Sequence, residues 1–559
     1  MSKAKTARPR DKASPGAGQN NAYGSDFVRK RQSSSNSPRL DFETTFDDPR
    51  TTTTIMTRRT RFVLLSALVI FILFVVVPHL RRGSTGTTTW NNAGGFENKD
   101  ELSGAAGTLQ DDERGIRITN TNNSPNVTSD GLCTEESCFR GAWKPRRPPL
   151  AKIDEVEPWK GCPSSLRGAT KEEERKASER RLLDVLNWVW VPDEGTLADW
   201  DPEAFVVRLL KSPGGLVSVG DDISKRHFEA LIVLLKRSVA LELFTSDQQS
   251  FRRKHVTQYI LAPNDPGTQR IYERAGVPDS RINRPILTMI EDSLLVSDTD
   301  LLTIVQRLGG VNGNQRWSPR LPRVDRWPVL VEDLAAPVDD ERESVTADTI
   351  LLLNTGIHWS REHLTLLKPR ANPLAEQNYL TEAYRQMLRT VSESLKPISN
   401  LSIYYRATTP GHPRCHTRTS PYKSAKLAET MEKNVVGRLL QGVLDEGERQ
   451  KRRKWDWDLF VVHNDLWRRA IVRLEQERKQ MEEKPYPFTK YYAKWRYLDV
   501  WSQALQRPDA HYDPTQDCLS WCSPVLFDQW TRHLQHVLNL EKPEFASKKD
   551  MPSEEDDIV

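Results

Sequence analysis

The chain has 559 residues, of which 37% are hydrophobic and 28% are charged, and it carries a formal net charge of +5. This length accommodates a polar tail together with one large domain or two ordinary ones. A mild positive charge without a clustered basic face is not typical of proteins that bind nucleic acid, so we expect no nucleic-acid partner.

The N-terminal part of the chain contains one long apolar run. Residues 1–61 are rich in Ser, Thr, Asn, Arg and Pro, which predicts a disordered cytosolic tail. Phe62 to Leu80 then contains no Asp, Glu, Lys or Arg. As a helix this run would span about 28 Å, close to the ~30 Å hydrocarbon core of a bilayer, and it is too long and too far from the N-terminus for a signal peptide. We therefore predict a single transmembrane helix at 62–80 that acts as a signal anchor.

The charges on either side of this run predict its orientation. Many Lys and Arg residues precede it, whereas Arg81 and Arg82 follow it and the next basic residue is Lys99. The positive-inside rule therefore favours a cytosolic N-terminus and a luminal remainder, which is a type II topology.

The cysteines and the glycosylation sequons agree with a luminal location. All the cysteines follow the apolar run, as expected for disulfides in an oxidising compartment: Cys133, Cys138, Cys162, Cys415, Cys518 and Cys522. They lack the C-x2-C pairs of structural zinc sites, so we predict disulfides and no metal, with the pairing left open. We expect the last two cysteines to tether the C-terminal segment to earlier parts of the chain. Sequons begin at Asn122, Asn126 and Asn400.

The remaining chain divides by composition. Residues 81–130 are rich in Gly, Thr, Asn and Ser and are predicted to form a flexible luminal stem. Residues 131–546 should form the folded body, and residues 547–559 an acidic tail.

Within the body, apolar strand-like runs alternate with amphipathic helices. The runs are Leu216–Val219, Thr349–Leu353 and Asn400–Tyr405, and predicted helices cover Ile223–Val239 and Asp465–Lys484, the second with a largely solvent-exposed face. Continuous Leu, Ile and Val strands separated by helices predict an α/β fold, a mostly parallel sheet covered by helices on both faces. Ligands of such sheets bind beyond the carboxyl ends of the strands, so the polar residues after these runs should converge.

The most informative of these strand ends is Gly220-Asp221-Asp222, where the chain turns from a strand into a helix. The amides and the dipole of a helix N-terminus favour negative charge. Many hydrolases and acyltransferases place a nucleophilic serine directly after such a Gly-Asp pair, and this chain has Asp222 there.

Several sequence blocks together resemble one family. They are Asn187–Pro192 (NWVWVP), Trp200–Phe205 (WDPEAF), Val219–Asp222 (VGDD), Leu353–Trp359 (LNTGIHW), Tyr405–Pro413 (YRATTPGHP), Arg507–His511 (RPDAH) and Asp517–Pro524 (DCLSWCSP). In this order they resemble the PC-esterase family of SGNH-like acyltransferases, which includes the trichome-birefringence-like polysaccharide O-acetyltransferases of plants. The resemblance implies an SGNH-like fold and a type II Golgi protein that moves acetyl groups onto or off polysaccharide hydroxyls through an acyl-enzyme.

The chain departs from the family pattern at both reactive positions. The family carries its nucleophile in Gly-Asp-Ser and its carboxylate and base in Asp-x-x-His. Here Asp222 stands at the serine position and Ser520 at the histidine position, while Asp517 is kept. The matching oxyanion donors are the turn at Gly220, Asp221 and Asp222, with its backbone amides, and the side chain of Asn354. Loss of a triad nucleophile costs about a factor of 10⁶ in turnover.

Other candidates each have a functional and a structural interpretation. His511, His412 and His358 could act as replacement bases, or could be hydrogen-bonded structural histidines. Arg406 could hold a substrate carbonyl or form an ion pair. Tryptophans could stack on sugar rings or fill the core: Trp188, Trp190, Trp359 and Trp521. Ser224, the hydroxyl nearest to Asp222, should point away from the site because it lies about 200° around the helix.

Three hypotheses follow. In the first, a polysaccharide O-acetyltransferase or acetylesterase works with rearranged residues near Asp517. In the second, the body is a catalytically inactive pseudoenzyme that binds glycan, or that supports an active acetyltransferase or an acyl-donor transporter. In the third, Asp221, Asp222 and Asp517 hold a hard cation, although Asp221 capping the helix and Asp222 being solvated would account for two of these carboxylates. The expected partners are the membrane and a cell-wall or secreted polysaccharide, and we expect no cofactor.

Overall fold

The computed structural model describes residues 127–152, 170–244, 254–309, 321–364, 373–440, 455–485, 491–513 and 517–545. All of them belong to one compact unit, Ile118–Val559. The predicted tail, the predicted transmembrane helix, most of the stem and the acidic tail lie outside these residues, as do Asn122, Asn126 and Cys162. No helix within the described ranges is long and apolar enough to cross a membrane.

A central sheet of seven strands organises the body, in the order β4-β5-β6-β3-β7-β8-β9. The strands are β3 (Leu216–Gly220), β4 (Leu241–Leu243), β5 (Val256–Leu261), β6 (Leu287–Glu291), β7 (Thr349–Leu353), β8 (Leu401–Arg406) and β9 (Lys494–Leu498). β6, β3, β7, β8 and β9 run parallel to one another, and β5 and β4 add an antiparallel edge. The predicted mostly parallel α/β sheet is confirmed, and the three apolar runs correspond to β3, β7 and β8.

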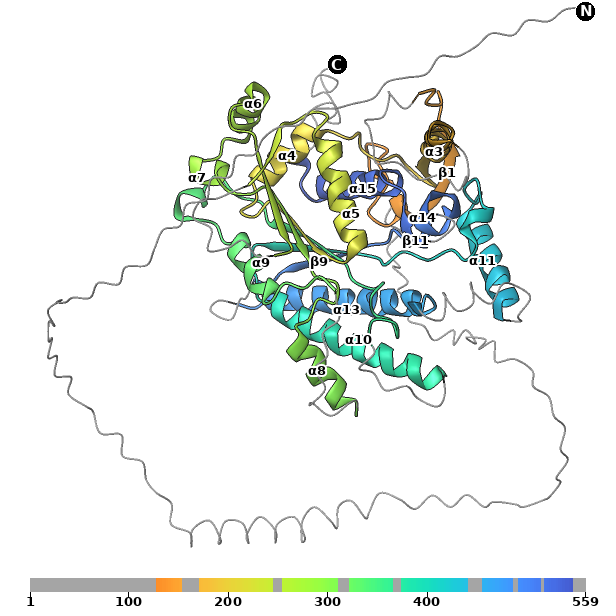
Figure 1. Cartoon of the computed structure of the whole chain (residues 1–559). Coiled ribbons are helices and arrows are strands. Elements are labelled where there is room, and N and C mark those ends of the chain that lie inside the picture. The colour runs from red at the N-terminus through yellow and green to blue at the C-terminus, as the bar shows by residue number, and fades with distance from the viewer. Residues whose placement is uncertain are drawn as a thin grey trace, which may run out of the picture. The chain divides into compact units, whose positions relative to one another are not determined.

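Helices cover both faces of this sheet (Figure 1), because alternate residues of each buried strand point to opposite sides. In β3, Leu216 packs into the core on one face, whereas Val217 and Val219 pack into the core on the other. The first core also takes side chains from α3 (Lys171–Leu186), α4 (Pro202–Leu210), α5 (Asp222–Leu235), α6 (Pro266–Ala275), α14 (Trp501–Leu505) and α15 (Val525–Glu541). The second takes them from α8 (Asp298–Arg307), α9 (Trp327–Ala335), α10 (Pro373–Leu395) and α13 (Leu459–Glu482).

Smaller elements surround these layers. β1 (Gly141–Pro145) pairs with β2 (Trp188–Pro192), and β10 (His511–Asp513) pairs with β11 (Asp517–Trp521), both antiparallel. The remaining elements are short helices or lie at the periphery: α7 (Asp279–Ile282), α11 (Ala425–Leu440), η2 (Ser137–Phe139), η4 (Asp339–Glu341), η5 (Cys415–Thr417), η6 (Pro508–Ala510) and η7 (Pro543–Phe545).

The two predicted helices form with shifted ends. α5 begins at Asp222 because Asp221 caps it: the Asp221 Oδ1 atom accepts from the amides of Ile223 at 3.1 Å and Ser224 at 3.3 Å. α13 begins six residues before the predicted start and buries Trp467 in the second core, while its opposite face is exposed to solvent.

Disulfides join distant parts of the body, as predicted. Cys415 pairs with Cys518 across 103 residues and so ties β11 to the loop after β8. Cys133 pairs with Cys138 near the start of the described chain. Cys522 is also disulfide-bonded.

Candidate functional site

The candidate site lies at the edge of the sheet where β3, β7 and β8 end. Gly220, the last residue of β3, allows these strand ends to approach closely. A Cβ atom at this position would lie 2.4 Å from the carbonyl oxygen of Asn354 and 2.4 Å from Ser224 Oγ. Only glycine fits between the two, so this residue fixes the distance between the turn after β3 and the end of β7.

A buried guanidinium joins the three strand ends. Arg406, the last residue of β8, is 1% exposed. Its Nη2 donates to Asn354 Oδ1 at 2.8 Å and to Ser224 Oγ at 3.3 Å. Its Nη1 lies 3.3 Å from His227 Nδ1, and the group stacks 4.9 Å from the ring of Trp530. The predicted convergence of polar residues is therefore confirmed.

This burial favours a structural role for Arg406 over contact with a substrate. Burial lowers the pKa of Arg406 to about 10, and the carboxylate of Asp221 opposes that change. Asp221 is buried as well, and burial raises its pKa against the positive charges of His358 and Arg406. The two groups balance charge inside the protein, and neither reaches solvent.

The amide of Asn354 is directed into the same network. Its Nδ2 donates to the Arg406 carbonyl oxygen at 2.7 Å and to Thr408 Oγ1 at 3.4 Å, while Oδ1 accepts from the Arg406 guanidinium. A carboxamide has only two N–H donors, and both are used. An oxyanion donor must instead point at the reacting oxygen, so this geometry does not provide the side-chain donor that the family pattern implies.

Ser224 lies beneath this edge. It is 3% exposed, and its Oγ donates to Asn354 Oδ1 at 3.4 Å while accepting from Arg406. Its hydroxyl is therefore held inside the network and is not presented at the surface as a substitute nucleophile.

Asp222 is the reactive-position residue that faces solvent. Its side chain is 56% exposed, and its Oδ2 lies 3.5 Å from Nε2 of the buried His358. The hydrogen bond from His358 is the largest cause that lowers the Asp222 pKa, and the charges of His358, Arg226 and Lys225 act in the same direction. The N-terminus of α5 also favours negative charge here. The site thus presents an ionised carboxylate.

A chain of hydrogen bonds fixes His358 behind this carboxylate. His358 Nδ1 lies 3.3 Å from His363 Nε2, and His363 Nδ1 lies 3.1 Å from Ser360 Oγ. If Ser360 donates to His363, then His363 donates to His358 and His358 donates towards Asp222, and every ring is satisfied in its neutral form. The ring of Trp455 packs 4.8 Å from His363 and 6.4 Å from His358.

The C-terminal motif lies in the β10–β11 hairpin and forms no triad. Asp517 Oδ1 accepts from the amides of Leu519 and Ser520, both at 2.9 Å. No imidazole among the described residues hydrogen-bonds to Asp517, and Ser520 is half-buried with its carbonyl oxygen 3.1 Å from His511 Nδ1. The kept carboxylate therefore organises its own turn.

Three further candidates are buried away from this edge. His412 and His511 are 0% exposed and bond to each other instead of facing Asp222 or Asp517. Trp359 is also 0% exposed and packs edge-on against Tyr384, so it offers no surface to a sugar. The core interpretation likewise fits the other tryptophans of the motifs: Trp190 and Trp521 are buried, and Trp188 is half-buried against the first core.

Sequence reasoning missed the support around Asp222. The Ser360-x-x-His363 spacing directly after His358 was a local signal that could have been found. Trp455 had no such signal, because it reaches the site from a segment almost 100 residues later in the chain.

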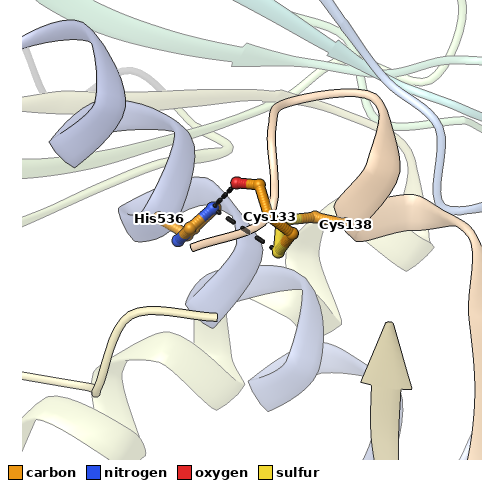
Figure 2. A group of neighbouring side chains, drawn as sticks. All are labelled: Cys133, Cys138 and His536. Carbon is orange, nitrogen blue, oxygen red and sulfur yellow. Dashed lines mark hydrogen bonds between the residues drawn. A yellow bond between two sulfur atoms is a disulfide. The ribbon is translucent and has the colours of Figure 1, made fainter. Parts of the chain in front are cut away.

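The proposed hard-cation site is wrong for these residues. Asp221, Asp222 and Asp517 do not come together, and the group closest to a metal geometry in the described chain is Cys133, Cys138 and His536. Figure 2 shows that the two sulfur atoms are already joined in a disulfide and that His536 Nε2 donates to the Cys133 carbonyl oxygen at 2.8 Å. The amide of Ala198 donates to the other ring nitrogen at 3.0 Å. The cluster anchors the start of the body to α15.

An α/β body with a carboxylate where an acyltransferase nucleophile would stand is what the fold and the site define. No family model matches the chain. Protein trichome birefringence-like 24 of Arabidopsis thaliana is 21% identical to it over 413 residues, which cover 70% of this chain and 79% of that protein. This similarity confirms the resemblance to the trichome-birefringence-like family that the motifs indicated.

Proposed function

We propose that this chain is a non-catalytic relative of the polysaccharide O-acetyltransferases, with an SGNH-like body that binds polysaccharide and no longer carries out serine-based acyl transfer. The observation that carries this proposal is the amide of Asn354, whose two donors are held by Arg406 and Thr408. Loss of one oxyanion donor costs about 10²–10³ in turnover, and loss of the nucleophile costs about 10⁶. Both parts are missing from the same site.

The exposed chemistry at this site suits binding. The ionised carboxylate of Asp222 can accept hydrogen bonds from sugar hydroxyls. Trp455 lies in the same cluster of side chains and is half-buried, so part of its apolar ring can contact the face of a sugar ring.

A membrane anchor and a luminal location belong to the same proposal. The run Phe62 to Leu80 would hold the chain in a Golgi or other secretory-pathway membrane, with the body in the lumen. Disulfides in the body support an oxidising compartment. Protease added to sealed microsomes should remove the N-terminal tail and leave the body intact. Digestion of the body in sealed vesicles would contradict this topology.

Two measurements on the purified full chain test the function. Incubation with an acetyl donor and xylan or mannan should give no acetylated product. Affinity electrophoresis in gels that contain the same polysaccharides should show retardation, which Asp222→Asn should weaken. Glu273→Gln, which removes an exposed carboxylate on α6, is the matched control and should leave the retardation unchanged.

A reconstruction separates lost residues from lost geometry. The double variant Asp222→Ser with Ser520→His restores the family residues, but we expect it to remain inactive because Asn354 is still turned towards Arg406. Acetyl transfer by the unmodified chain that disappears in Asp517→Ala would refute the proposal. Activity gained only in the reconstruction would show that the oxyanion geometry is sufficient and would remove our main argument.

A further inference from the structure

Two buried histidines face each other where three segments of the chain meet. His412 lies in the loop after β8, and His511 is the first residue of β10. Both are 0% exposed, and His412 Nδ1 lies 2.7 Å from His511 Nε2. Neither ring belongs to the Arg406 network or to the hydrogen-bond chain behind Asp222.

The outer nitrogen of each ring faces a backbone carbonyl oxygen. His412 Nε2 lies 3.0 Å from the Leu505 oxygen, and His511 Nδ1 lies 3.1 Å from the Ser520 oxygen. A carbonyl oxygen only accepts, so both outer nitrogens must carry a hydrogen. A neutral imidazole has a single N–H. In two neutral rings the inner nitrogens would therefore present lone pairs to each other, and their contact is a hydrogen bond only if a third proton is present.

We propose that His412 and His511 form a proton-binding site whose shared proton fastens the β10–β11 hairpin to the loop after β8. With the proton bound, the pair carries three N–H groups and one positive charge, and all three contacts are hydrogen bonds. When the proton leaves, one of these bonds becomes a contact between two lone pairs, and the hairpin loosens.

The surroundings act on this proton in both directions. Burial lowers the pKa of each imidazole, and the charge of His412 lowers that of His511 further. Among the charged groups, Glu432 and Asp509 favour the proton on His412, Arg418 opposes it, and Arg181 opposes the proton on His511. The hydrogen bonds of the charged pair act against burial, because losing the proton also breaks a buried bond.

The neighbouring disulfide confines the loosening to the hairpin. Cys518 in β11 is bonded to Cys415, three residues after His412, and the His412 amide donates to the Cys518 carbonyl oxygen at 3.0 Å. The covalent link stays when the proton leaves, so we expect a local opening and no general unfolding.

The sign of the pH dependence tests the proposal. If the folded pair holds a proton that free histidine would release, its stabilisation is complete below about pH 6.5 and is lost as the pH rises through the pKa of the pair. Above that pKa, the opening constant of the hairpin amides should rise by up to about tenfold per pH unit. Hydrogen exchange measured by mass spectrometry on the full chain, corrected for intrinsic rates, gives this constant between about pH 5 and pH 8.

Variants isolate the pair. In His412→Gln the carboxamide can donate to both Leu505 and His511 without an extra proton, so the pH dependence of the hairpin should disappear. His536→Gln is the matched control, since His536 is satisfied by one proton, and it should keep the dependence. Hairpin protection in the wild type that is constant or increases with pH over this range, and that His412→Gln leaves unchanged, would overturn the proposal.

A second measurement covers the case in which the variant does not fold. Ring ¹⁵N spectra of the wild-type chain distinguish imidazolium from neutral imidazole. At about pH 6 we expect one imidazolium signal protected from solvent exchange. Spectra in which every protected ring is neutral at that pH would sink the shared-proton idea.

Discussion

Replacement of Arg406 tests whether charge balance holds the strand ends together. Arg406→Leu removes the donor to Asn354 Oδ1 at 2.8 Å and two weaker contacts, to Ser224 and His227. It also leaves the carboxyl of Asp221 buried without the guanidinium. Breaking a buried charged network by removing one partner costs about 3–5 kcal/mol, so we expect a loss of that size in the free energy of unfolding.

A second substitution should recover part of this loss. Asp221→Asn removes the negative charge but keeps a side-chain oxygen that can cap α5. Alone it should destabilise the protein, because Arg406 then lacks its counter-charge. In the double variant the two charges disappear together, and the loss should fall short of the sum of the single losses by about 1–3 kcal/mol.

Urea unfolding of the full chain, followed by tryptophan fluorescence, measures these free energies. Arg468→Leu is the control, because Arg468 is half-exposed and its pair with Asp499 should be worth only about 0–1 kcal/mol. The reasoning is refuted if Arg406→Leu costs no more than the control, or if the losses at 221 and 406 simply add.

Three further predictions concern single features. Serine at both Cys415 and Cys518 should cost about 4.7 kcal/mol by loop entropy, against about 2 kcal/mol for the disulfide near α15, as urea midpoints would show, and equal losses would contradict this. Gly220→Ala should lower stability by about 1–3 kcal/mol, since its Cβ would meet the Asn354 carbonyl; an unchanged melting temperature would oppose this. Because its histidine partner lowers the Asp222 pKa, the stabilisation by Asp222 is present above the ordinary carboxyl pKa and is lost as pH falls through the lowered one, so Asp222→Asn should flatten the acid limb of the unfolding curve, and an unaltered limb would count against the pairing.

The sequence predicted the frame of the body better than its chemistry. Thr349–Leu353 was found to the residue because a fully buried parallel strand is a continuous apolar run. The turn at Asp222 was placed correctly because the helix-capping carboxylate of Asp221 is a local signal. Both features depend on neighbours in the chain.

Side-chain direction depends on partners far away in the sequence and could not be predicted. Whether Asn354 faces the surface or the interior is decided by Arg406, which lies 52 residues later. His412 and His511 were weighed as bases one at a time, and only their 2.7 Å contact, across 99 residues, shows that they belong together. The chemistry of the site therefore follows from tertiary contacts.

The outer strands of the sheet bear on how the protein behaves at high concentration. An exposed strand edge is a template on which another chain can add a strand and start aggregation. β4 has only three residues and carries Glu242 at its centre, whereas β9 carries Lys494 and Arg496. The lysine pairs with Asp348 at 2.7 Å, and the arginine pairs with Glu541 at 3.2 Å. A copy that docked its own strand here would have to desolvate these charges, so the sheet should resist edge-to-edge polymerisation even in a crowded compartment.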